Sequence, residues 1–112
     1  MSVPAHEQVG YSFTAWQTVV DDERQGRFHK AVAIDSTLFS GMVDVSVLSN
    51  DCLHGARPRE ALGAKRLHIG VRVRQLRPVP LGEDLSVEAQ VTAIRPALRG
   101  RYIEVAFQFR AL

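Results

Sequence analysis

The sequence predicts an α+β domain in which a curved antiparallel sheet wraps around one apolar helix. Three segments of the C-terminal half alternate apolar and polar residues, which is the period of half-buried strands. One segment in the middle of the chain is apolar and longer than a usual strand. Because the helix and the sheet each have an apolar surface to bury, we expect them to pack against each other.

Size and composition fit one globular unit. The chain has 112 residues, 46% of them hydrophobic and 23% charged, and a net charge of +2. We expect a single domain over residues 1–112. No apolar run reaches the roughly 20 residues that span a bilayer, and the first residues do not resemble a secretion signal. The lone Cys52 is typical of a reducing compartment, so we expect a cytoplasmic protein without a membrane partner.

The N-terminal part predicts a strand followed by a short helical turn. Residues 11–20 are rich in aromatic and β-branched side chains, which favours a strand. Asp21 and Asp22 can then cap a helical turn, and Gly26 is expected to limit its length. Residues 31–35 form a short apolar approach to the next element.

The middle of the chain can be interpreted in two ways. Valines at alternate positions from 43 to 47 favour a strand, whereas the apolar residues from 42 to 53 also share one side of a helix. The length of 41–54 favours the helix, with Ser40 as its N-cap and Gly55 as its stop. This helix is apolar on most sides, so we expect it to be buried.

The C-terminal part predicts a three-stranded antiparallel meander. Apolar residues alternate in 67–76, 85–93 and 101–110. The connections RPVPLGED and RPALRG contain the prolines and glycines that are typical of turns. Strands joined by such short turns pair with their neighbours in the sequence.

This order of elements is that of the hot-dog fold, and the resemblance extends to motifs. Residues 9–28, VGYSFTAWQTVVDDERQGRF, resemble the opening of MaoC-like hydratases, and FSGM at 39–42 resembles the start of their central helix. Residues 71–91, VRVRQLRPVPLGEDLSVEAQV, resemble a strand, turn and strand that MaoC-like proteins share with hot-dog thioesterases. The resemblance covers nearly the whole chain, and the RPVPLGE turn is its most specific part.

The resemblance implies a substrate class and a form of assembly. Proteins of this kind act on acyl thioesters of coenzyme A or acyl carrier protein, usually as dimers with the active site between subunits. The acyl chain runs along the central helix, whose N-terminal N–H groups can polarise the thioester carbonyl. Here that position is Ser40, Gly41 and Met42. Arg57 and Arg66 could bind phosphates or an acidic carrier surface, or could simply be solvated.

The expected catalytic residues leave three functions open. MaoC-like hydratases carry an aspartate followed by a histidine before the helix; Asp35 can fill the first position, but Ser40 stands at the second. One alternative is a dehydratase or hydratase subunit that works with a second hot-dog chain or uses His29 with Asp44. Another is a thioesterase with Asp44 as nucleophile or base. The last is a non-catalytic acyl-thioester binding partner. In each case we expect a homodimer or a heterodimer with another hot-dog subunit.

Each of these residues also has a purely structural interpretation. Asp44 could be a polar residue at a helix start, and Asp35 could be a cap. His29 lies in a polar run, which favours a surface position. Cys52 is expected to pack in the core. The histidines lack the spacing of metal ligands and the arginines are not concentrated on one element, so we expect no metal, no cofactor and no nucleic acid.

Overall fold

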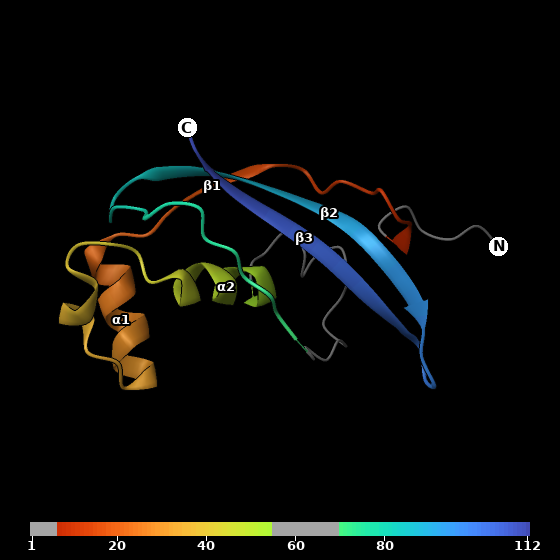
Figure 1. Ribbon diagram of the computed structural model, residues 1–112, viewed down its shortest axis with the longest axis horizontal. Coiled ribbons are helices and arrows are strands. Elements are labelled where there is room, and N and C mark those ends of the chain that lie inside the picture. The colour runs from red at the N-terminus through yellow and green to blue at the C-terminus, as the bar shows by residue number, and fades with distance from the viewer. Residues whose placement is uncertain (1–6, 55–69) are drawn as a thin grey trace.

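The computed structural model describes residues 7–54 and 70–112. In this part of the chain one strand is followed by the helices, and two further strands come last (Figure 1). In chain order the elements are β1 (Trp16–Val19), α1 (Asp22–Val32), the 3₁₀ helix η2 (Ser36–Phe39), α2 (Val45–His54), β2 (Asp84–Pro96) and β3 (Arg101–Ala111). The predicted α+β class is therefore confirmed.

The three strands form one antiparallel sheet in the order β1-β2-β3. Val87 in the middle strand pairs with Trp16 on one side and with Phe109 on the other. A register shift between Val91 and Ala93 interrupts the β2–β3 pairing, as a β-bulge does. The predicted alternation is confirmed on β2, where the side chains of one face are buried: Leu85, Val87, Ala89 and Val91.

The strand predicted over residues 67–76 is not found in its described part. Residues 70–76 form no strand, and Val71 and Leu76 are 62% and 82% exposed. Residues 67–69 lie outside the described residues. The edge of β2 that this strand would use is paired with β1 instead. An alternating pattern indicates that a segment can form a strand. It does not predict which of two such segments, here β1 or residues 70–76, pairs with the edge of β2.

Helix α1 is longer than the sequence predicts. Asp21 caps it as expected, since its side chain accepts a hydrogen bond from the Arg24 backbone N–H at 2.8 Å. Gly26 does not limit the helix, which continues to Val32 and ends at Ala33 in a left-handed conformation (φ 58°). A glycine inside a helix costs only about 1 kcal/mol, which the burial of this helix's other side chains can offset.

Helix α2 begins later than predicted. Ser40 is not its N-cap, because Ser40 adopts a left-handed conformation (φ 48°) at the end of η2. The intervening backbone is extended beside residues 79–81: Val43 N–H donates to Val79 O at 2.7 Å, and Leu81 N–H donates to Gly41 O at 2.9 Å. These long-range hydrogen bonds keep the chain out of the helix until Val45.

The apolar core has two parts. The Leu85 cluster contains Val20, Val43, Val47, Leu48 and Leu85 and joins α2 to the sheet. The Phe13 cluster contains Phe13, Ala89 and Val91, with partly buried aromatic and aliphatic side chains around it. Figure 1 shows α2 along one side of the sheet, and α1 at the end of the molecule where β1 leads into it. Helix α2 is only partly buried, since Val47 and Leu48 are covered while Ser46 and Asn50 are exposed.

Candidate functional site

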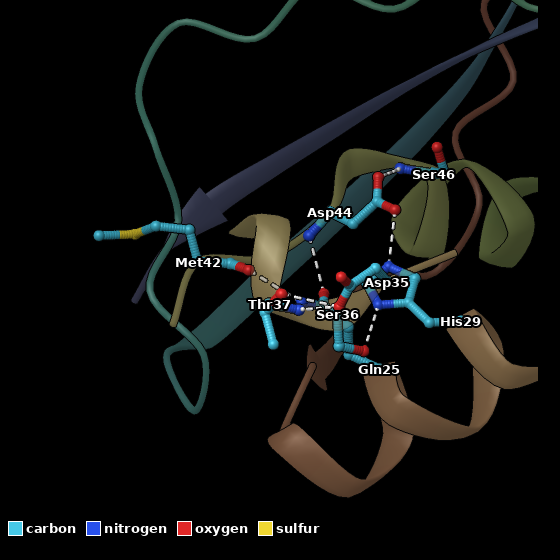
Figure 2. Close-up of polar contacts among 8 residues, drawn as sticks. All are labelled: Gln25, His29, Asp35, Ser36, Thr37, Met42, Asp44 and Ser46. Atoms are coloured by element: carbon cyan, nitrogen blue, oxygen red, sulfur yellow. Dashed lines mark hydrogen bonds and ion pairs between the residues drawn. The ribbon is translucent and has the colours of Figure 1, made fainter. Parts of the chain in front are cut away.

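Asp44 occupies the position immediately before α2 and is 4% exposed. Its Oδ1 accepts a hydrogen bond from the Ser46 backbone N–H at 3.0 Å, so Asp44 is the cap that sequence analysis assigned to Ser40. Its Oδ2 remains available and points away from the helix, toward α1 (Figure 2). The carboxylate of Asp44 therefore caps the start of α2 and also contacts α1.

His29 is the partner of that second oxygen. Its Nε2 lies 2.8 Å from Asp44 Oδ2, and its side chain is 1% exposed. The interpretation of His29 as a surface residue is wrong, because the buried face of α1 includes His29 and Gln25. The ring of Phe39 stacks on the imidazole at 4.8 Å and 24°, which fixes the plane of the ring. The structure thus brings together the His29–Asp44 pair that sequence analysis offered as one alternative.

Gln25 holds the backbone around Asp44 in place. Its Oε1 accepts a hydrogen bond from the Asp44 backbone N–H at 2.7 Å, and its Nε2 donates to Met42 O at 2.9 Å. Because a backbone N–H can only donate and a carbonyl can only accept, these two bonds fix the orientation of the amide. Gln25 therefore ties α1 to the segment that leads into α2, and this sets the distance between His29 and Asp44.

The second ring nitrogen of His29 contacts η2. Ser36 Oγ lies 2.6 Å from His29 Nδ1 (Figure 2). Ser36 is exposed, whereas His29 and Asp44 are buried. We call these four side chains, Gln25, His29, Ser36 and Asp44, the polar corner. No buried side-chain nitrogen or oxygen in the described part of the chain lacks a hydrogen-bond partner, so the polar corner is fully satisfied.

Asp44 is held as the ionised carboxylate. Burial is the largest influence on its pKa and acts to raise it, because a buried charge is poorly solvated. The hydrogen bonds from Ser46 and the contact with His29 together outweigh burial, and the pKa of Asp44 lies below its ordinary value of 3.8. An ionised carboxylate only accepts hydrogen bonds, so His29 Nε2 must carry a hydrogen and donate a hydrogen bond to Asp44.

An open groove lies beside Asp44. It has a volume of about 440 Å³. Its walls come from two parts of the chain, the residues before and at the start of α2 and the segment before β2. The lining residues are Phe39, Met42, Val43, Asp44, Val45, Gln75, Leu76, Arg77 and Pro78. Most of these side chains are apolar, and Asp44 is the carboxylate among them, so the groove combines an apolar wall with one reactive group.

The other predicted catalytic residue, Asp35, is used locally. Its Oδ1 accepts hydrogen bonds from Thr37 Oγ1 at 2.7 Å and from the Thr37 backbone N–H at 3.0 Å, so it caps η2. The Thr37 hydroxyl, and then the Thr37 N–H, lower the pKa of Asp35 from its ordinary value. Asp35 is exposed and forms no hydrogen bond with His29 or Asp44.

The predicted substrate-binding residues fall in three places. Met42 lines the groove, and Ser40 and Gly41 form the turn before it. Because α2 begins at Val45, these residues do not present the helix N-terminal N–H groups that sequence analysis expected. Gly41 has a φ of 79°, which a glycine adopts without strain. Arg57 and Arg66 lie outside the described residues.

Two residues of the polar corner were missed by sequence analysis. Gln25 and Ser36 carry no motif, and each becomes important only through the fold. The sequence could have indicated Gln25, because it lies one helical turn before His29 and residues at that spacing share one face of a helix. No such spacing indicates Ser36, because its contact depends on how η2 folds back onto α1.

Other titratable groups lie apart from the polar corner. Asp51 forms an ion pair with Arg24 that joins α2 to α1. Cys52 is half-buried rather than fully in the core, and burial, followed by the charge of Asp51, raises its pKa to about 11. Among residues 7–54 and 70–112, no group of three or more His, Cys, Asp and Glu side chains could hold a metal ion, and no helix is long and apolar enough to cross a membrane.

Comparison with known proteins adds no relative to this description. No protein-family model matches the chain, and neither a curated protein nor a solved structure is similar to it.

Proposed function

We propose that the chain is a subunit of an acyl-thioester dehydratase or hydratase of the MaoC-like branch of the hot-dog superfamily. The observation that carries this proposal is the 2.8 Å contact between His29 Nε2 and Asp44 Oδ2, with Asp44 at the wall of an apolar groove. An acid–base pair beside an apolar groove is what adding water to a bound acyl chain, or removing it, requires.

The arrangement of elements supports the hot-dog assignment. An antiparallel sheet has α2 along one side, and Val47 and Leu48 of α2 pack in the same cluster as Leu85 of β2. The RPVPLGE turn, the most specific part of the resemblance, pairs with the segment before α2 through Met42 and Pro80. This turn therefore helps to set where α2 begins and where Asp44 lies.

The reaction can be written with the groups present. In the hydration direction, Asp44 takes a proton from a water molecule while the water oxygen bonds to the β-carbon of an enoyl thioester. The proton then passes to the α-carbon, which gives the 3-hydroxyacyl thioester. His29 keeps its Nε2 proton, donates a hydrogen bond to Asp44 Oδ2, and holds the carboxylate in place during both transfers. Dehydration follows the same steps in reverse.

The groove suits the acyl part of such a substrate. Phe39, Met42, Val45 and Leu76 line it with apolar side chains. The acyl chain is carried by coenzyme A or acyl carrier protein, whose phosphates would stay in solvent because the groove is open. Leu76, which lines the groove, is exposed, and so are Val71 and Val73 earlier in the same segment. This exposed apolar segment supports a second hot-dog subunit, either a copy of this chain or a different one.

The test uses enoyl and 3-hydroxyacyl thioesters of coenzyme A with the purified chain. We expect water to be gained or lost, and we expect Asp44→Asn to reduce turnover by about 100-fold or more because the base is removed. Asp22→Asn is the matched control, since Asp22 is exposed in the first turn of α1. Equal turnover by the Asp44→Asn and wild-type proteins would remove Asp44 from the reaction.

A thioesterase is a second candidate, and the ionised state of Asp44 favours it. A carboxylate whose pKa is lowered can attack the thioester carbonyl or activate a water molecule at the groove. The same incubation distinguishes the two reactions, because hydrolysis releases a free thiol and hydration does not. Binding of the acyl thioester without either product would instead indicate the non-catalytic partner.

A further inference from the structure

Ser36, His29 and Asp44 form an unbroken chain of hydrogen bonds from the surface to the interior. Ser36 Oγ is 2.6 Å from His29 Nδ1, and His29 Nε2 is 2.8 Å from Asp44 Oδ2. The buried end of the chain is a carboxylate and the exposed end is a hydroxyl. The proposed hydration uses only His29 and Asp44, and Ser36 has no role in it.

The direction of each hydrogen bond follows from the carboxylate. Asp44 can only accept when ionised, so the proton of a neutral His29 resides on Nε2. The Nδ1 lone pair is then free to accept, and the donor facing it is the Ser36 hydroxyl. The proton of Ser36 therefore points at a base, which is the condition for activating a serine as a nucleophile.

The orientation of the base is fixed from several sides. Phe39 stacks on the imidazole, and the Asp44 carboxylate is itself held by the Ser46 N–H. Ser36 begins η2, and Asp35 stabilises that turn through Thr37. The ring nitrogens are used in the reverse of the usual order in serine hydrolases, where the serine contacts Nε2 and the aspartate contacts Nδ1. The roles of the three groups are nevertheless the same.

We propose that Ser36 is a nucleophile activated by His29 and Asp44, and that the chain forms an acyl-serine intermediate with carboxylic esters or acyl thioesters. Ser36 Oγ bonds to the acyl carbon, its proton moves to His29 Nδ1, and the bond to the leaving alcohol or thiol breaks. His29 returns the proton to the leaving group. A water molecule then attacks the acyl-serine, transfers its proton through His29 to Ser36 Oγ, and releases the acid.

The experiment uses a fluorophosphonate probe, which phosphonylates activated serines with loss of fluoride, and intact mass measurement of the full chain. We expect one adduct, located at Ser36 by peptide mapping, and none in Ser36→Ala. Asp44→Asn and His29→Gln keep Ser36 but weaken the base, so labelling should slow by about 100-fold. Ser86→Ala, a substitution in β2 away from the polar corner, should label at the wild-type rate.

Circular dichroism of each variant shows whether it is folded before it is labelled. Absence of an adduct on the folded wild-type chain overturns the proposal, and so does an adduct on any residue other than Ser36. The proposal is also overturned if His29→Gln and Asp44→Asn are both labelled at the wild-type rate, because the serine would then need no base. A labelled Ser36 without hydratase turnover contradicts only the dehydratase proposal, whereas hydratase turnover without labelling contradicts only this one.

Discussion

The polar corner and the Phe13 cluster are two ways of filling a protein interior. The Phe13 cluster buries Phe13, Ala89 and Val91 against the β2–β3 sheet and contains only apolar side chains. The polar corner buries Gln25, His29 and Asp44, and each is satisfied by directed hydrogen bonds. The stability of the Phe13 cluster depends on how well its side chains fill the available volume. The stability of the polar corner depends on the positions of individual donor and acceptor atoms.

This difference has consequences for stability and for chemistry. Apolar packing is stabilised in proportion to the area removed from water and does not depend on pH. A buried polar network adds little net stability while it is complete, but losing one partner leaves another group buried without a hydrogen bond. Catalysis needs reactive groups held in fixed positions, and directed hydrogen bonds hold them so. We therefore expect the functional residues in the polar corner rather than in the Phe13 cluster.

The largest expected effect is in the Phe13 cluster. Phe13 is 6% exposed and its ring contacts Tyr11 edge-on at 5.1 Å. Phe13→Ala removes these contacts and leaves a cavity, so we expect the free energy of unfolding to fall by about 3–5 kcal/mol, as measured in urea. Phe13→Leu fills most of the space and is the control. A loss that is equally large for both variants would contradict an origin in packing volume.

A smaller but pH-dependent effect is expected in the polar corner. Asp44→Asn replaces one of two oxygens that accept hydrogen bonds, so at neutral pH we expect a loss of about 1–3 kcal/mol. The wild-type pKa of Asp44 is below its ordinary value, and so its ionisation stabilises the fold at neutral pH. That stability is fully present above the ordinary pKa and is lost as the pH falls through the lowered one.

The measurement is urea unfolding from about pH 6 to about pH 2. Acidification should destabilise Asp44→Asn less than the wild type, because the variant no longer has this carboxylate to protonate. Phe13→Leu should follow the wild-type pH dependence, since it changes no titratable group. Parallel curves for wild type and Asp44→Asn would show that Asp44 is not the group that gives the polar corner its pH dependence.

The smallest expected effect tests the helix that carries His29 and Gln25. Asp21 caps α1 at the surface, and Asp21→Ala should lower the free energy of unfolding by about 1 kcal/mol. Asp21→Asn retains an oxygen that accepts the Arg24 N–H and is the control. Helix content by circular dichroism and thermal unfolding check the effect. A loss that is no greater for alanine than for asparagine would show that the cap adds nothing beyond charge.

Local patterns predicted those parts of the fold that depend on neighbours in the sequence. The alternation in 85–93 and 101–110 predicted β2 and β3, and Asp21 was correctly identified as a cap. The start of α2 was predicted too early, because the preceding segment is kept extended by hydrogen bonds to a distant part of the chain. Val43 N–H donates to Val79 O, and Leu81 N–H donates to Gly41 O. For the candidate site, His29 and Asp44 were named, but their contact was only one of several alternatives.

The sequence by itself determined the α+β class, the β2–β3 hairpin and the cap of α1 at Asp21. Each follows from spacing within a few residues, where hydrophobic period and capping act directly. Only the tertiary structure decided that β1 pairs with β2 while residues 70–76 stay outside the sheet, and that His29 turns inward to meet Asp44 and Ser36. Both outcomes depend on which segments, far apart in the sequence, form hydrogen bonds and apolar contacts with each other. A pattern within a few neighbouring residues does not specify those partners.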